Sequence, residues 1–420
     1  MTQISDRALA ALDQAVGSPM RRRKLIVLVL VRYYLPGHKS GGPVRSISNM
    51  VAQLGDEFDF RIITSDRDSL DDTPYTGVVV DTWNQVGKAK VYYLSPKSHS
   101  ILALVKLLSK TNYDVLYLNS FFDPVFTQQA LWARRLGLLP AKPVVIAPRG
   151  EFSAAAFRLK QWKKLPYRWL TSAIGLYRDL IWHASSEFEA ENIRHVISRD
   201  DLQIRIAIAV ASDLSTLFDE SGLVSSSHTR KPGEPLRIAF LSRIAPMKNL
   251  DFALRVLAKV NIPVNFYIFG PMEDESYWRQ CEGLIAGLPP NISVRYEGAV
   301  DHSQVASVLE SHDLFFLPTR GENYGHVIME SLSVGTPVLI ADTTPWRNLE
   351  QAGVGWELTL DNEQQFADKI HDAEQISNEA YRLWRKQVRF YALEYAADAE
   401  IIASNRRLFM EAAGEAAPTN

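Results

Sequence analysis

The chain has 420 residues, of which 46% are hydrophobic and 22% charged. That length and composition suit a soluble protein with two domains, and the formal net charge of -2 gives no reason to expect a nucleic-acid partner. The single cysteine, Cys281, excludes an intrachain disulfide framework, and the apolar run from Leu25 to Val31 is too short to cross a bilayer. We therefore expect a cytoplasmic protein.

Residues 1–23 are predicted to be an N-terminal extension, and residues 24–211 a first α/β domain in which apolar runs alternate with helical patterns. The first strand, Leu25 to Val31, leads to Gly41 and Gly42, after which a helix begins. Glycines at that point allow the backbone to approach a ligand at a helix N-terminus. Their spacing is not that of the dinucleotide-binding G-x-G-x-x-G motif, which counts against a nicotinamide enzyme.

Polar residues follow two later strands of this domain. Asn119 comes after the strand from Val115 to Leu118, and Arg149 comes after the strand from Pro143 to Ile146. Because parallel strands end at one edge of a sheet, both side chains are candidates for one wall of a ligand-binding cleft. A salt bridge with Glu151 is the alternative for Arg149.

Asp66 and Asp68 have the spacing of a carboxylate pair that could hold a divalent cation. Two further aspartates, Asp71 and Asp72, follow closely, and such a run is typical of a solvated loop. We therefore expect no metal site here.

Basic and aromatic residues interleave between residues 157 and 178. Indole rings and cations are both favoured in the headgroup layer of a membrane, so this stretch predicts a peripheral membrane contact on the cytoplasmic face of the inner membrane. A solvated helix that packs its aromatic side chains inward is the alternative. The residues concerned are Arg158, Lys160, Trp162, Lys163, Lys164, Tyr167, Arg168 and Trp169.

Residues 212–235 are rich in Ser, Gly, Pro and charge and are predicted to be a linker, while residues 236–387 predict a second α/β domain. In that domain the strand from Leu236 to Leu241 leads to a loop that carries Arg243 and Lys248. A guanidinium fork and a mobile ammonium group together suit a diphosphate. The chain is expected to end in a helix over residues 388–413 and a disordered tail over residues 414–420.

A strand, loop, helix and strand unit lies between Leu314 and Ile340. Its helix begins near Gly325, so the free backbone amides of Tyr324 to Val327 favour an anion such as a phosphate. Glu330, about two turns into the helix, is placed to accept hydrogen bonds from a ribose diol, and Glu322 in the loop from other hydroxyls. An amphipathic helix preceded by an exposed loop glutamate is the alternative.

A series of motifs in this half of the chain resembles the C-terminal half of family 4 retaining glycosyltransferases of the GT-B fold, of the kind that build bacterial polysaccharides. The motifs occur in the order Arg243 with Lys248, Gly270 closing a strand, Glu297-Gly298, Glu322-Asn323-Tyr324-Gly325 with Glu330, and Gly335-Thr336-Pro337. The resemblance implies two Rossmann-like, doubly wound domains that face each other across a cleft. It also implies that the terminal helix crosses back to the first domain.

The resemblance further implies a metal-independent transferase, without a cofactor, that moves a sugar from a nucleoside-diphosphate sugar to a hydroxyl of a glycan or lipid-linked glycan. The residues expected to act in catalysis are Glu322, Arg243 and Lys248. Those expected at the donor nucleotide are Arg243, Lys248, Gly270, Gly298, Asn323, Tyr324, Gly325, His326 and Glu330. Those expected on the acceptor side are Gly41, Gly42, Asn119 and Arg149, although many relatives have a histidine where this chain has Arg149.

Two other functions share this architecture. A UDP-sugar 2-epimerase would have the same nucleotide site but would turn over without an acceptor. A non-catalytic nucleotide-sugar binding protein would bind the donor and transfer nothing.

Overall fold

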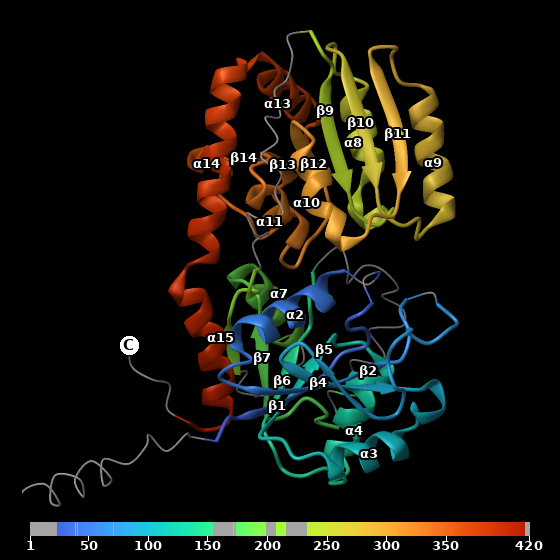
Figure 1. The fold of residues 1–420 in the computed structure, drawn as a ribbon, viewed down its shortest axis with the longest axis vertical. Coiled ribbons are helices and arrows are strands. Elements are labelled where there is room, and N and C mark those ends of the chain that lie inside the picture. The colour runs from blue at the N-terminus through green and yellow to red at the C-terminus, as the bar shows by residue number, and fades with distance from the viewer. Residues whose placement is uncertain are drawn as a thin grey trace, which may run out of the picture.

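Two α/β domains are stacked end to end, and the C-terminal helices run alongside both (Figure 1). The computed structural model describes residues 23–37, 39, 41–69, 71–153, 171, 174–198, 207–215 and 233–415. The predicted extension, most of the basic and aromatic stretch, most of the linker and most of the tail lie outside the described residues.

The first domain is built on an eight-stranded sheet with strand order β3-β4-β2-β1-β5-β6-β7-β8. All neighbouring strands are parallel except the pair β3 and β4. The strands are β1 (Ile26–Leu30), β2 (Asp59–Ser65), β3 (Trp83–Val86), β4 (Ala89–Leu94), β5 (Val115–Asn119), β6 (Val144–Ala147), β7 (Leu180–Ala184) and β8 (Ala207–Val210). Every residue of β1, β5 and β6 is buried, as expected for central parallel strands that are covered on both faces.

Helices cover both faces of this sheet. Helices α3 (Ile101–Lys110), α4 (Gln129–Arg135) and α7 (Glu187–Ser198) pack on one face, and α2 (Gly42–Leu54) with α15 (Ala399–Ala412) packs on the other. Short helices η1 (Pro96–Ser98) and η2 (Pro124–Gln128) connect the elements. This arrangement gives the domain two hydrophobic cores, one on each side of the sheet.

The second domain has an all-parallel, six-stranded sheet with strand order β11-β10-β9-β12-β13-β14. Its strands are β9 (Leu236–Leu241), β10 (Val264–Phe269), β11 (Ile292–Gly298), β12 (Leu314–Leu317), β13 (Val338–Ala341) and β14 (Gly355–Leu358). Its helices are η4 (Pro246–Lys248), α8 (Leu250–Leu257), α9 (Glu275–Ala286), α10 (His302–Glu310), α11 (His326–Ser333), α12 (Leu349–Ala352), α13 (Glu363–Gln375) and α14 (Asn378–Ala396). The two doubly wound sheets confirm the predicted α/β class.

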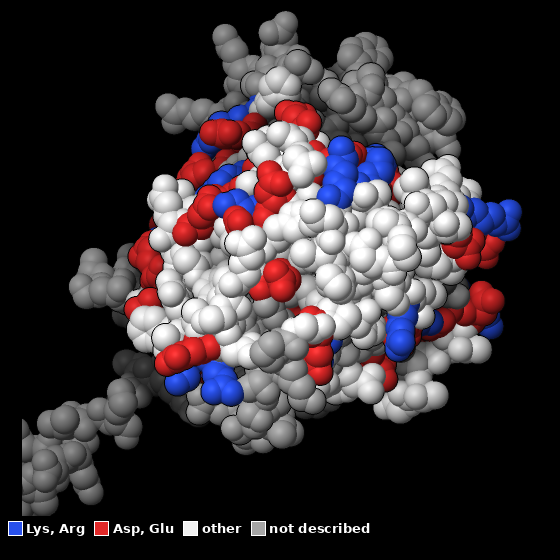
Figure 2. All heavy atoms as spheres, turned by 90° about the horizontal axis from the view of Figure 1, so that it is seen from above, with Lys and Arg blue, Asp and Glu red and all other residues white. Residues whose placement is uncertain are grey.

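The second-domain strands point toward the first domain, so their carboxyl ends lie at the domain junction (Figure 1). The opposite end of this domain carries acidic and basic side chains interspersed around its margin, without a broad field of one sign (Figure 2). Ligands of doubly wound sheets bind at the carboxyl ends of the strands, so the domain junction is the expected location of a ligand-binding site.

The chain returns to the first domain through α15. Residues 388–413, expected as one helix, are divided between α14 and α15, because Asp398 starts a new helix by accepting a hydrogen bond from Glu400 N. Asn405 of α15 is fully buried, and its Nδ2 donates to the carbonyl of Ser212 at 2.7 Å. The ring of Phe409 makes edge contacts with three aromatic rings of the first domain, those of Phe58, Phe60 and Tyr117.

We expect Phe409→Ala to lower the free energy of unfolding of the first domain by about 3–5 kcal/mol, because it leaves a cavity between α15 and the sheet. Urea unfolding followed by near-UV circular dichroism measures this change. Phe390→Ala is the matched control, because the Phe390 side chain of α14 is 59% exposed. Equal stability losses in the two variants would contradict the packing role of α15.

Candidate active site

The loops after β9, β10 and β11 meet at the carboxyl edge of the second sheet. Gly270 N donates to Gly298 O at 2.7 Å, and a Cβ on Gly270 would lie 1.9 Å from Ser242 O. Position 270 therefore requires glycine, because this backbone packs directly against the residue before Arg243. The guanidinium of Arg243 forms an ion pair with Glu273, and its side chain is 46% exposed.

Lys248, at the end of η4, lies beside the loop that precedes α11. Arg320 N donates to Met247 O at 2.9 Å, which fixes the two loops against each other. Lys248 Nζ forms an ion pair with the Glu322 carboxylate, and both side chains are only 14% exposed. The structure thus brings two of the three predicted catalytic residues into contact, while Arg243 has a different carboxylate as its partner.

Gly325 is the N-cap of helix α11 and has a left-handed backbone with φ 81°. A Cβ at this position would lie 2.8 Å from the Ile328 side chain, so glycine is required on two grounds. No side chain caps the helix. The indole of Trp346 donates to Tyr324 O at 2.6 Å and holds the preceding loop in place.

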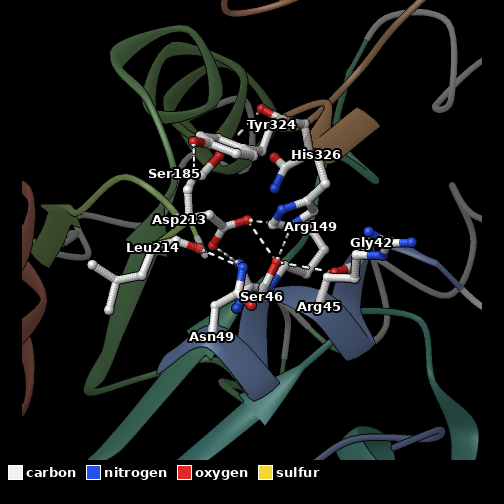
Figure 3. Close-up of polar contacts among 12 residues, drawn as sticks. Gly42, Arg45, Ser46, Asn49, Arg149, Ser185, Asp213, Leu214, Tyr324 and His326 are labelled. Atoms are coloured by element: carbon white, nitrogen blue, oxygen red, sulfur yellow. Dashed lines mark hydrogen bonds and ion pairs between the residues drawn. The ribbon is translucent and has the colours of Figure 1, made fainter. Parts of the chain in front are cut away.

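Four of the predicted donor-site residues, Asn323, Tyr324, His326 and Glu330, contact the first domain. A Cβ on Gly150 would lie 3.1 Å from Asn323 Cβ, and Tyr324 OH is 2.5 Å from Ser215 Oγ. His326 Nε2 is 3.0 Å from Ser46 Oγ (Figure 3). Glu330 forms an ion pair with Arg45, whose pKa burial lowers to about 10, so Arg45 stays charged at neutral pH.

Arg149 is the centre of a buried polar network in the first domain (Figure 3). Its Nη1 lies 2.5 Å from Asp213 Oδ1, and the two side chains are 5% and 2% exposed. Its remaining nitrogens donate to Tyr117 OH at 2.8 Å and to Asn119 Oδ1 at 3.1 Å. Burial opposes the charged forms, but the two groups stabilise each other, so the pKa of Arg149 is raised and that of Asp213 is lowered.

The alternative salt bridge between Arg149 and Glu151 is wrong. The Glu151 carboxylate instead accepts hydrogen bonds from Ser120 Oγ at 2.6 Å and from the backbone amides of Phe121 and Phe122. Arg149 has a left-handed backbone with φ 56°, an uncommon conformation for a non-glycine residue, which orients its side chain differently from that of Glu151. Arg149 thus lies beside Asn119, and the two side chains are adjacent at the carboxyl ends of β5 and β6.

Gly41 and Gly42 lie at the start of α2, where Gly41 has φ 60° and a Cβ on either glycine would meet no atom within 4 Å. The same helix supplies Arg45 and Ser46, which the sequence analysis did not single out. Asp213 was not predicted as a site residue either, because it falls in the stretch assigned to the linker. For Ser46, the sequence held one signal: a serine that lies among the apolar positions of α2 is a candidate for a buried hydrogen bond.

Asp66 and Asp68 have protein partners. Arg67 Nε donates to Asp66 Oδ1 at 2.8 Å, and Lys39 N donates to Asp68 Oδ2 at 3.0 Å. Within the part of the chain that the structure describes, no three His, Cys, Asp or Glu side chains gather as a metal site would require.

Residues 225–389 match the family described as "Glycosyl transferases group 1". The chain is 24% identical over 249 residues to an uncharacterized 41.2 kDa protein in the cps region of Klebsiella pneumoniae, covering 59% of this chain and 65% of that protein. It is also 24% identical over 264 residues to the phosphatidyl-myo-inositol mannosyltransferase of Mycobacterium leprae, covering 62% of this chain and 63% of that enzyme. The alignments thus span just under two thirds of the length of these relatives.

Solved structures match nearly the whole chain. The Anabaena protein HepE, in a crystal structure with UDP and glucose, has a TM-score of 0.64 at 16% identity, covering 93% of this chain and 100% of that chain. WaaG, a glycosyltransferase involved in lipopolysaccharide biosynthesis, has a TM-score of 0.62 at 13% identity, covering 92% of this chain and 100% of that chain. The chain therefore has the GT-B fold, and its residues 225–389 match the group 1 glycosyltransferase family, in agreement with the resemblance noted in the sequence.

We expect Asp213→Ala to lower the free energy of unfolding by about 3–5 kcal/mol, because it leaves the buried guanidinium of Arg149 without its counter-charge. Chemical denaturation measures the loss. Asp56→Ala is the matched control, since Asp56 pairs with Lys88 at a side-chain exposure of 77% and exposed ion pairs contribute little. A variant Asp213→Ala as stable as the control would contradict the role assigned to the pair.

Proposed function

We propose that this protein is a retaining glycosyltransferase that moves a sugar from a nucleoside-diphosphate sugar to a hydroxyl of a glycan or lipid-linked glycan acceptor. The observation that carries the proposal is the ion pair of Lys248 with Glu322 beside the uncapped start of α11, within the segment that matches the group 1 family and facing the first domain. Relatives named for the cps region and for lipopolysaccharide biosynthesis support a role in polysaccharide assembly.

The proposed chemistry depends on charge at the leaving group. As the bond between the anomeric carbon and the phosphate oxygen breaks, negative charge grows on the diphosphate. Arg243, Lys248 and the amides of Tyr324 to Val327 would stabilise that charge more in the transition state than in the ground state. These groups belong to the chain itself, so the proposal includes no divalent metal ion.

The acceptor oxygen would attack the same face of the sugar from which the diphosphate leaves, and its proton would pass to the leaving phosphate oxygen. Attack on the same face retains the anomeric configuration, and it does so without a protein nucleophile. Glu322 would orient hydroxyls of the donor sugar, and Glu330 would accept from the ribose. Gly41, Gly42, Asn119 and Arg149 would line the acceptor side.

In the ligand-free structure the charged groups of this site already have partners. Lys248 is paired with Glu322, Arg243 with Glu273, and Arg45 with Glu330. A donor would therefore bind by exchange, in which its diphosphate replaces carboxylates as the partner of Arg243 and Lys248. Its ribose would likewise compete with Arg45 for Glu330.

We expect Lys248→Ala and Arg243→Ala each to remove about 2–4 kcal/mol of transition-state stabilisation, which is a loss of roughly 30- to 1,000-fold in kcat/KM. Glu330→Ala should mainly raise KM for the donor, and Glu322→Ala should mainly lower kcat. A donor is first chosen by thermal shift with UDP-, GDP- and ADP-sugars, and transfer is then measured on a panel of acceptors.

Arg279→Ala is the control, because Arg279 lies on α9 with a side chain that is 78% exposed. Activity of Lys248→Ala within about threefold of this control would contradict the assignment. Sugar epimerisation without an acceptor would point to a 2-epimerase, and donor binding without transfer would point to a binding protein.

We also propose that the first domain docks on an anionic membrane, on the cytoplasmic face of the inner membrane. None of the helices described here has the length and hydropathy that a membrane-spanning segment requires. A cavity of about 430 Å³ lies between the end of α4 and residues 174–178, and its lining includes Trp132, Arg135 and Arg178. Leu136, which also lines this cavity, is 62% exposed, and Leu138, two residues further along the chain, is 46% exposed.

Two arginines of α4 beside this cavity have main-chain carbonyls as partners. Arg134 and Arg135 donate to the main-chain carbonyls of Arg178, Asp179 and Ile174. Among the described residues, no carboxylate forms an ion pair with Arg134, Arg135 or Arg178. Guanidinium groups next to exposed leucine side chains are the combination that the headgroup layer favours.

We expect the double variant Arg135→Glu/Arg178→Glu to bind vesicles of phosphatidylglycerol and phosphatidylcholine at least about tenfold more weakly than wild type, since each basic residue near an anionic surface contributes about 1 kcal/mol. Cosedimentation measures the binding. Lys259→Glu/Arg279→Glu, on the second domain, makes the same charge change and should have little effect. Wild type that stays wholly in the supernatant would refute the proposal.

A further inference from the structure

His326 is the first residue of α11, yet its imidazole makes its polar contacts with the first domain (Figure 3). Its Nε2 lies 3.0 Å from Ser46 Oγ and 3.7 Å from Asp213 Oδ2, and its side chain is 11% exposed. Ser46 is 280 residues away in the sequence, so this contact exists only when the two domains lie together.

The proton positions around Ser46 follow from the distances. Ser46 Oγ is 2.6 Å from Asp213 Oδ2 and 3.1 Å from Gly42 O, and a hydroxyl has one proton to donate. Two oxygen atoms 2.6 Å apart would repel each other without a proton between them, so the proton lies toward the Asp213 carboxylate. Ser46 Oγ then accepts a hydrogen bond, and His326 Nε2 must be the donor.

This assignment leaves a lone pair on His326 Nδ1. A neutral imidazole has one N–H, and Nε2 carries it. Among the residues that the structure describes, no protein atom forms a hydrogen bond with Nδ1, and Nδ1 is not sealed from solvent. The side chain therefore presents an acceptor at the domain junction, next to the start of α11.

Several charged or titratable groups face this imidazole: Asp213, Arg149, Arg45 and His302, together with the ring of Tyr324 at a centroid distance of 4.8 Å. Burial lowers the pKa of His326 to about 4. The cations of Arg45 and Arg149 act in the same direction, while Asp213 opposes them. Asp213 is also the ion-pair partner of Arg149, and its attraction for an added proton on His326 is outweighed by burial, so the pKa stays lowered.

We propose that closure of the two domains fixes His326 as a neutral hydrogen-bond acceptor for a hydroxyl group of the substrate, with Ser46 and Asp213 as the positioning residues that set its tautomer. The proposal rests on the proposed function for the identity of the substrate, but the tautomer itself does not depend on it. Because Nδ1 can accept and cannot donate, it suits a sugar or acceptor hydroxyl and not a phosphate oxygen.

The same arrangement makes closure sensitive to pH. An imidazole exposed in an open state has a pKa near 6.5, whereas the closed state lowers it to about 4. The open state therefore binds more protons between these values, so closure is fully favoured above pH 6.5 and weakens by up to tenfold per pH unit as the pH falls toward about 4.

The tautomer is tested by two-dimensional NMR of ligand-free protein labelled with ¹⁵N-histidine at pH 7.5, with His326→Gln identifying the His326 signals. We expect Nδ1 to have the shift of an unprotonated nitrogen and Nε2 that of an N–H. Ser46→Ala should abolish this preference, and Ser46→Thr, which keeps the hydroxyl, should restore it. A protonated Nδ1 in wild type, or a spectrum unchanged by Ser46→Ala, would overturn the proposal.

Small-angle X-ray scattering provides a second measurement that needs no substrate. The radius of gyration of wild type should rise as the pH falls from 7.5 to 5, and that of His326→Gln should rise less. Equal pH dependence in both proteins would refute the coupling of closure to His326. Because neither measurement uses a donor, both results stand even if no transferase activity is found, so failure of this proposal and failure of the proposed function are distinguishable.

Discussion

The buried pair of Arg149 and Asp213 is the interaction on which the domain junction depends. A guanidinium and a carboxylate removed from water are stable only when each has the other, and here the remaining donors of Arg149 are used by Tyr117 and Asn119. The other oxygen of Asp213 accepts from Ser46, and Ser46 in turn contacts His326 of the second domain. One ion pair in the first domain thus determines the hydrogen bonding at the start of a helix in the other.

A second set of ion pairs gives the junction its electrostatic character. Lys248 with Glu322, and Arg45 with Glu330, join cations and carboxylates of low exposure at the carboxyl ends of the second-domain strands. Such pairs contribute little net stability, because the cost of desolvation offsets most of their attraction. A charged ligand can therefore replace one partner at modest cost, provided that it satisfies the group left behind.

The fold supports this exchange through its connections. The carboxyl ends of the second-domain strands face the first domain, and the chain returns from the second domain to the first through α14 and α15 (Figure 1). Gly335 allows α14 to pack closely on the second domain, since a Cβ there would lie 2.7 Å from Arg385 O. Phe409 and Asn405 fix α15 to the first domain. Between these two anchored helices, the chain breaks at Ala397 and Asp398.

The sequence by itself determined the α/β class and the two domains, and it predicts the residues of the candidate donor site. Those features are local: a buried strand, a loop with Glu322 and Gly325, and a helix with Glu330 follow one another within a short stretch, and periodicity reports them directly. Only the tertiary structure decided which first-domain groups oppose them. Arg45, Ser46 and Asp213 are ordinary residues in their own segments, and they meet Glu330 and His326 because the fold brings α2 and Asp213 of the first domain against α11 of the second. The tertiary structure also decided the ion-pair partner of Arg149. Arg149 has a left-handed backbone, and its side chain pairs with Asp213, which the fold brings close, and not with Glu151, which is near in the sequence.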